Sequence, residues 1–224
     1  GQEVGTAAIA SIARRLGLTT PINTQPSMVL GTSDVRLIDM TRAYATVSAK
    51  GKSVTPYGIV RVTTANGDTL YQRPKQPDLQ IVDPWVAAGM TDMMQTAVSA
   101  GTGRAAQIGR PVAGKTGTTS SNKDGWFLGF SSGITTGVWM GRDDARPVRD
   151  LQGGRAPATA FAAFMQVAVA KRPVEKFETD VTLPEWMLES DEQAYLGDAN
   201  ASQPAPLVDE NGQPIPEAGS ADQY

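Results

Sequence analysis

The sequence predicts a mixed α/β fold of the α+β type, in which an antiparallel sheet is flanked by helices. Two observations indicate this fold class. Apolar residues recur with helical spacing in four separate segments, and residues 111–141 contain three short β-rich runs separated by turn residues. Because such short connections join sequential strands antiparallel, the three runs are expected to form a meander. With 40% apolar and 19% charged residues, the 224-residue chain can build a sizeable core.

Four helices are predicted, covering residues 4–16, about 35–49, 84–99 and 156–171. Gly17 ends the first helix, Ser33 is the candidate N-cap of the second, and Asp83-Pro84 opens the third. On the last helix we expect Phe161, Phe164 and Val167 to share the apolar face.

The strands are predicted in two groups. Residues 57–64 and 69–73 form a hairpin around Asn66-Gly67, a dipeptide that tolerates positive φ at both turn positions. The meander consists of residues 111–119, 126–131 and 134–141, with Ser132-Gly133 as a tight turn. We expect its aromatic residues to pack on the sheet and not to form a ligand site; they are Trp126, Phe127, Phe130 and Trp139.

Composition excludes several kinds of chemistry. The chain has no cysteine, which rules out disulfides and thiolate metal sites, and no histidine, which rules out an imidazole base. Residues 173–224 hold twelve acidic residues and one basic residue, whereas residues 1–172 hold nineteen basic and eleven acidic ones. This break predicts two parts: a mildly basic folded domain over 1–172, and an acidic, proline-rich and largely disordered extension over 173–224.

The most informative stretch is residues 109–119, Gly-Arg-Pro-Val-Ala-Gly-Lys-Thr-Gly-Thr-Thr. It matches the phosphate-loop pattern G-x-x-x-x-G-K-[ST] and also contains Lys-Thr-Gly, a motif of penicillin-recognising serine enzymes. A phosphate loop lies between a buried strand and a helix, but this stretch contains Pro111 and is followed by β-branched and turn residues. The flanks favour Lys-Thr-Gly on the first strand of the meander.

Each short motif also has a plainer explanation. An isolated Lys-Thr-Gly is more often a surface lysine among turn glycines, and only the neighbouring sequence raises Lys115 above that interpretation. Ser120-Ser-Asn-Lys123 spells S-x-x-K, but its composition predicts a turn, whereas a serine and lysine pair needs one turn of helix. The charged run from Arg142 to Arg146 predicts a solvated turn with local ion pairs.

These motifs have neighbours that extend the pattern over about residues 2–172. They are Pro26-Ser-Met-Val-Leu-Gly-Thr-Ser33, Pro56-Tyr-Gly-Ile59, Gly101-Thr-Gly-Arg-Ala-Ala106, Lys123-Asp-Gly-Trp-Phe-Leu-Gly-Phe130 and Thr136-Gly-Val-Trp-Met-Gly-Arg-Asp-Asp144. Together with residues 109–119 they resemble the transpeptidase domain of class A, 1A-type penicillin-binding proteins, specifically its C-terminal portion. The resemblance implies a penicillin-binding transpeptidase or serine β-lactamase-like fold that is incomplete without an upstream segment.

The resemblance also implies an activity and a site. The family cross-links peptidoglycan stem peptides as a serine D,D-transpeptidase inhibited by β-lactams, without a cofactor or metal. By likeness, Lys115 and Thr118 are catalytic, and Thr116, Gly117, Thr118 and Thr119 bind substrate, with the Thr118 N–H as an oxyanion donor. The nucleophilic serine and the S-x-N motif are expected upstream, so that the chain alone is expected to be inactive.

The implied partners and setting follow from the same resemblance. We expect D-Ala-D-Ala stem peptides, β-lactams and the upstream half of the domain as partners, with no nucleic acid and no membrane contact from this segment. The implied location is the periplasmic face of the bacterial inner membrane. Two alternatives remain: a non-catalytic β-lactam- or peptidoglycan-binding module of the same fold, and a P-loop nucleotidase.

Overall fold

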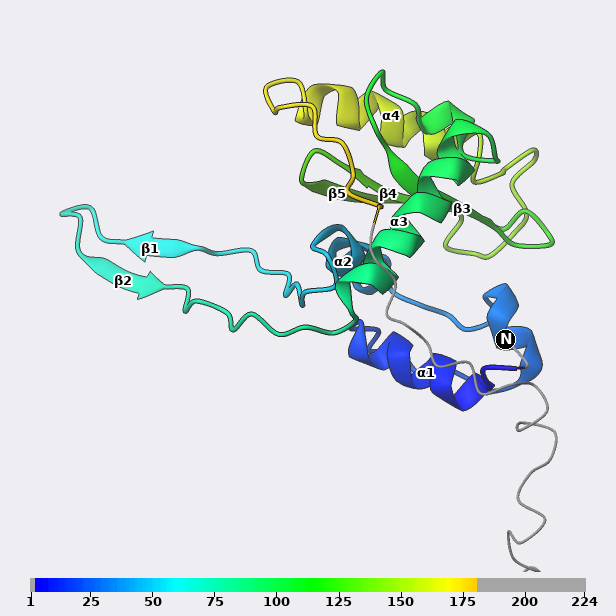
Figure 1. Cartoon of the computed structure of the whole chain (residues 1–224), viewed down its shortest axis with the longest axis horizontal. Coiled ribbons are helices and arrows are strands. Elements are labelled where there is room, and N and C mark those ends of the chain that lie inside the picture. Colours follow the sequence, from blue (N-terminus) through cyan, green and yellow to red (C-terminus); the bar gives the residue numbers. More distant parts are fainter. Residues whose placement is uncertain (1–2, 181–224) are drawn as a thin grey trace, which may run out of the picture. The chain divides into compact units, whose positions relative to one another are not determined.

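The computed structural model describes residues 3–180, which fall within one compact unit, Gly1–Thr182 (Figure 1). The helices and strands, in chain order, are α1 (Thr6–Arg15), η1 (Pro26–Leu30), α2 (Leu37–Ser48), β1 (Arg61–Thr63), β2 (Thr69–Gln72), α3 (Pro84–Ser99), η2 (Arg104–Ala106), β3 (Ala113–Thr118), β4 (Asp124–Ser131), β5 (Ile134–Gly141) and α4 (Ala156–Ala168). The predicted mixed fold, with antiparallel sheets and helices, is confirmed. Most of the predicted acidic extension lies outside the described residues.

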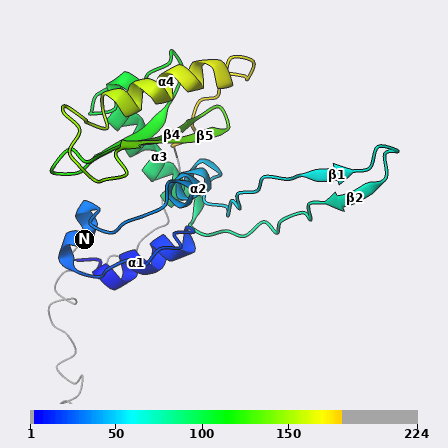
Figure 2. The same cartoon turned by 180° about the vertical axis from the view of Figure 1, so that it is seen from behind.

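The central sheet is antiparallel with strand order β3-β4-β5. Ser132 and Gly133 join β4 to β5 with φ values of 48° and 73°, the two-residue turn that the sequence predicts. Helix α4 covers one face of this sheet, and α2 and α3 cover the other (Figures 1 and 2). Within residues 3–180, β3 and β5 each pair only with β4, so both are edge strands.

The core forms on both faces of β4, because successive side chains of a strand point to opposite sides. Phe127 is fully buried and packs against Phe161 of α4, with ring centroids 4.7 Å apart. Phe130 is buried on the other face, where Met94 of α3 packs beside it. Phe177, in the segment after α4, meets the Phe130 ring edge-on. The prediction that sheet aromatics pack in the core is confirmed for Phe127 and Phe130.

Two expectations about the helices are wrong. On α4, Phe164 and Val167 are 55% and 78% exposed, while the buried stripe consists of Pro157, Ala158, Phe161, Ala162 and Met165. Apolar residues surround this helix on all sides, so periodicity could not fix which face turns inward. Ser33 does not cap α2, whose N-cap is Arg36; the Ser33 hydroxyl instead accepts a hydrogen bond from the Asn23 side chain at 2.8 Å.

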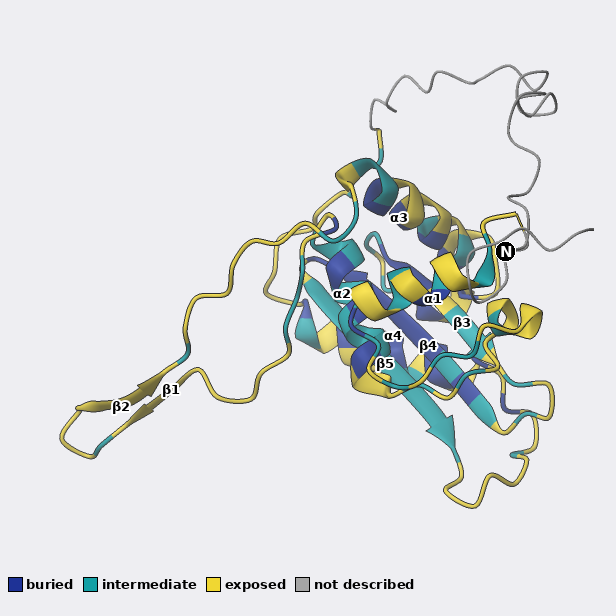
Figure 3. Ribbon diagram, turned by 90° about the horizontal axis from the view of Figure 1, so that it is seen from below, coloured by how far each residue is buried: buried dark blue, intermediate teal, exposed yellow. Residues whose placement is uncertain are grey.

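The hairpin β1–β2 lies apart from the central sheet, and all its strand residues are exposed (Figures 1 and 3). Its turn differs from the predicted two-residue form, because only Gly67 has positive φ and the Gly67 N–H bonds to the Thr64 carbonyl. A single antiparallel β-bridge between Lys52 and Gln80 joins the two segments that lead into and out of this hairpin. In residues 3–180 we find no helix with both the length and the apolar character that crossing a membrane requires.

Candidate active site

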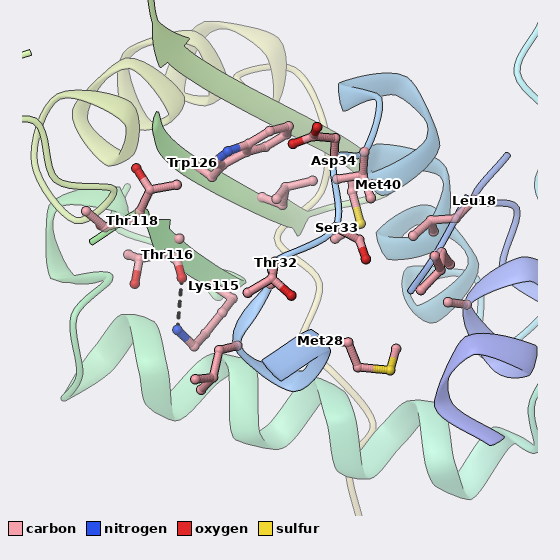
Figure 4. Close-up of a pocket in the computed structure, with 18 of the residues that line it drawn as sticks. Leu18, Met28, Thr32, Ser33, Asp34, Met40, Lys115, Thr116, Thr118 and Trp126 are labelled. Carbon is pink, nitrogen blue, oxygen red and sulfur yellow. Dashed lines mark hydrogen bonds between the residues drawn. The ribbon is translucent and has the colours of Figure 1, made fainter. Parts of the chain in front are cut away.

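The Lys-Thr-Gly residues lie on β3, an edge strand, where side chains alternate between the two faces. Lys115 pairs with Leu128 and Thr116 with Phe127 across β4, which places Lys115 on the opposite face from Thr116 and Thr118. The Lys115 ammonium folds along the strand and donates to the Thr116 carbonyl at 2.9 Å (Figure 4). The Thr116 carbonyl therefore faces the open edge and not β4.

A cleft of about 740 Å³ lies beside this strand. One wall is the end of β3, including Lys115 through Thr119, with Trp126 and Leu128 of β4. The other wall comes from α1, η1, the residues leading into α2 and α2 itself, with Met28, Thr32, Ser33, Asp34 and Met40 on it (Figure 4). The structure thus brings all five sequence-predicted site residues to one cleft.

The lining of this cleft is mainly apolar. Its charged residues, among those described, are Lys115 and Asp34. Tyr44 also lines the cleft, and burial raises the pKa of its phenol to about 12. The cleft therefore presents one ammonium group and one carboxylate in a mainly apolar lining.

The two threonines of β3 contact segments that are distant in the chain and lie outside the Lys-Thr-Gly motif. The Thr116 and Thr102 hydroxyl oxygens are 2.6 Å apart. The Gly153 N–H donates to the Thr118 hydroxyl oxygen at 3.0 Å. The available signal in the sequence was the glycine content of residues 101–103 and 153–154, which permits close backbone approach but does not say to what.

The turn after β3 excludes two other interpretations. Asn122 has a φ of 51°, and the Thr119 hydroxyl accepts the N–H groups of Lys123 and Asp124, so Ser120–Lys123 is a turn and not a helix. Gly114, Lys115 and Thr116 lie inside β3 and are followed by this turn and another strand. The phosphate-loop interpretation is therefore wrong, because no helix N-terminus follows the motif.

The acidic and basic residues after β5 form local ion pairs, as predicted. Asp144 accepts from both Arg142 and Arg146, and these hydrogen bonds lower the pKa of the Asp144 carboxyl well below its usual range. All three side chains are substantially exposed, so the pairs contribute little to stability. Among the described residues, no cluster of acidic side chains could hold a metal ion.

Comparison with known proteins identifies the family. Residues 24–166 match the family described as penicillin binding protein transpeptidase domain. The chain belongs to this transpeptidase family. The resemblance stated from the motifs is thereby confirmed.

Curated relatives agree with this assignment. The chain is 35% identical over 184 residues to penicillin-binding protein 2D of Bacillus subtilis (strain 168), covering 78% of this chain and 26% of that protein. It is 32% identical over 180 residues to penicillin-binding protein 1A of Aquifex aeolicus (strain VF5), covering 79% and 24%. The chain thus spans about a quarter of the length of these relatives.

Solved structures of the same family share the fold. The penicillin-binding protein PonA1 of Mycobacterium tuberculosis superposes with a TM-score of 0.69 at 27% identity, covering 78% of this chain and 53% of that one. PonA1 has also been solved in complex with penicillin V. Penicillin-binding protein 1A of Haemophilus influenzae gives a TM-score of 0.70 at 23% identity, over 82% of this chain and 33% of that one.

Proposed function

We propose that this chain supplies the Lys-Thr-Gly side of a serine D,D-transpeptidase site, which cross-links peptidoglycan stem peptides and is acylated by β-lactams. The observation that carries the proposal is the position of Lys115: its ammonium lies at the wall of a cleft, on an edge strand, within the region that matches the transpeptidase family. The family assignment also favours the periplasmic face of the inner membrane as the place of action.

The open edge of β3 suits an extended peptide. The Thr119 N–H bonds to Asp124 at the start of β4, so Thr118, one residue earlier, directs its N–H and carbonyl to the open edge. A stem peptide lying along this edge would receive backbone hydrogen bonds in the manner of an added strand. The Thr118 N–H would then serve as one oxyanion donor, which would lower the activation free energy by about 2.7–4 kcal/mol.

Lys115 and the threonines have separate roles in the proposed site. The exposed Lys115 ammonium provides positive potential and proton control at the position where the S-x-N serine is expected. The hydroxyls of Thr116 and Thr118 would bind the terminal carboxylate of the stem peptide or of a β-lactam, with Gly117 and Thr119 completing this wall.

The nucleophile is expected on the upstream half of the domain, and exposed apolar side chains at the cleft and on α3 support such a partner. Leu30 is 84% exposed, and Met90 and Met93 of α3 are 41% and 61% exposed. The cleft adds an apolar wall that includes Ile9, Leu18 and Ile22. Apolar surface of this kind marks places where other protein surface packs.

Labelling with a fluorescent penicillin tests the proposal. The chain is mixed with the upstream half of its domain, and the labelled half is identified after denaturing separation. We expect label on the upstream half, at least a hundredfold less with Lys115→Ala, and unchanged with Lys171→Ala, an exposed lysine beyond α4. Absence of label would favour a non-catalytic module. Label on this chain itself would mean that one of its own serines is the nucleophile, contrary to the proposal.

A further inference from the structure

We propose that Thr102 and Gly153 are positioning residues, which hold the hydroxyl groups of Thr116 and Thr118 as donors toward the carboxylate of the ligand. This inference rests on the function proposed above. Neither residue belongs to the Lys-Thr-Gly motif, and they come from the loop after α3 and the loop before α4.

The direction of the hydrogen bonds decides what each threonine can offer. The Gly153 N–H can only donate, so the Thr118 hydroxyl oxygen is the acceptor in their 3.0 Å contact. The Thr118 hydroxyl hydrogen is therefore left for another acceptor. A carboxylate accepts and never donates when ionised, so it is the complementary ligand.

The second threonine has the same arrangement through a hydroxyl pair. The Thr102 and Thr116 oxygens are 2.6 Å apart, and either can be the donor. When a carboxylate approaches Thr116, the favourable arrangement has Thr102 donating to Thr116 and Thr116 donating to the carboxylate, because an ionised carboxylate can only accept hydrogen bonds. Each bond in such a chain polarises the next, which strengthens the contact to the anion.

Close backbone packing holds these partners in place. A Cβ on Gly153 would lie 2.4 Å from the carbonyl oxygens of both Gly117 and Trp126, which are paired across β3 and β4. A Cβ on Gly154 would lie 2.3 Å from the Thr102 carbonyl oxygen. The Gly153-Gly154 pair therefore lets one loop lie directly on the strand and on the Thr102 loop at once. The loop before α4 is fixed against the site at the residue between the two threonines.

This arrangement predicts selectivity for a carboxylate. The test uses the protein in which this chain and its upstream half form the complete domain, and compares acylation rate constants for benzylpenicillin and for its uncharged methyl ester. We expect Thr102→Val to lower the rate constant for the acid about tenfold and that for the ester less than about twofold. Thr102→Ser, which keeps the hydroxyl, should restore the preference for the acid.

The control is Thr135→Val, which makes the same chemical change on β5, the strand at the opposite edge of the sheet from β3. It should leave both rate constants unchanged. An equal loss for acid and ester in Thr102→Val, or no loss, would overturn the positioning role while the transpeptidase function stands. Failure of the unaltered protein to react with either compound would overturn the proposed function, and the positioning role with it.

Discussion

Replacing Gly153 by alanine would place a methyl group against backbone on two strands. The new Cβ would lie 2.4 Å from the carbonyl oxygens of Gly117 and Trp126, whereas ordinary contacts begin at 3.4 Å. The loop must therefore lift by about 1 Å, which stretches the 3.0 Å bond from the Gly153 N–H to Thr118 beyond hydrogen-bonding range. Strain of about 1–3 kcal/mol and a lost bond of about 1 kcal/mol outweigh the gain of about 0.4–1 kcal/mol from a stiffer unfolded chain.

The expected result for Gly153→Ala is a free energy of unfolding lower by about 1–3 kcal/mol. Urea unfolding of the chain, followed by tryptophan fluorescence, measures it, because Trp126 and Trp139 lie in the sheet with ring centroids 6.5 Å apart. Gly89→Ala is the matched control: Gly89 is inside α3 with open space at its Cβ, and the change should stabilise the helix by about 0.5–1 kcal/mol. A midpoint for Gly153→Ala at or above that of the unaltered chain would refute the close-packing explanation.

Acid should expose the role of Asp39, which is buried and accepts hydrogen bonds from the Thr19 hydroxyl and N–H. These bonds lower the pKa of the Asp39 carboxyl below its ordinary 3.8. The ionised carboxylate therefore stabilises the folded chain above pH 3.8, and this stabilisation is lost as the pH falls through the folded-state pKa. The difference in melting temperature between the unaltered chain and Asp39→Asn should therefore shrink below about pH 4; a difference independent of pH would contradict this. In the core, Phe127→Ala should cost about 3–5 kcal/mol in urea unfolding, while the exposed Phe164→Ala should change stability by less than about 0.5 kcal/mol. Equal effects of the two substitutions would show that the assignment of buried faces is wrong.

The sequence was sufficient for the parts of the site that depend on local pattern. Because side chains of a strand alternate, a Lys-Thr-Gly strand puts Lys115 on the opposite face from Thr116 and Thr118, and the turn residues after Thr119 favoured this strand over a phosphate loop. The motifs also indicated the family that residues 24–166 match. These conclusions needed only the alternation of side chains along a strand, the turn-forming residues that follow it and the residue sequence of the motif.

What the tertiary structure decided involves residues far apart in the chain. Helical periodicity could not choose between Phe161 and Phe164 on α4, because the choice depends on which side meets Phe127. Nor could it join Thr102 and Gly153 to the threonines of β3, since those contacts span 14 and 35 positions. The sequence by itself determined the motif, its strand and its family. Only the packing of distant loops onto that strand determined which groups support the Thr116 and Thr118 hydroxyls. Close approach between backbones requires glycine, but a glycine in the sequence does not show which segment it contacts.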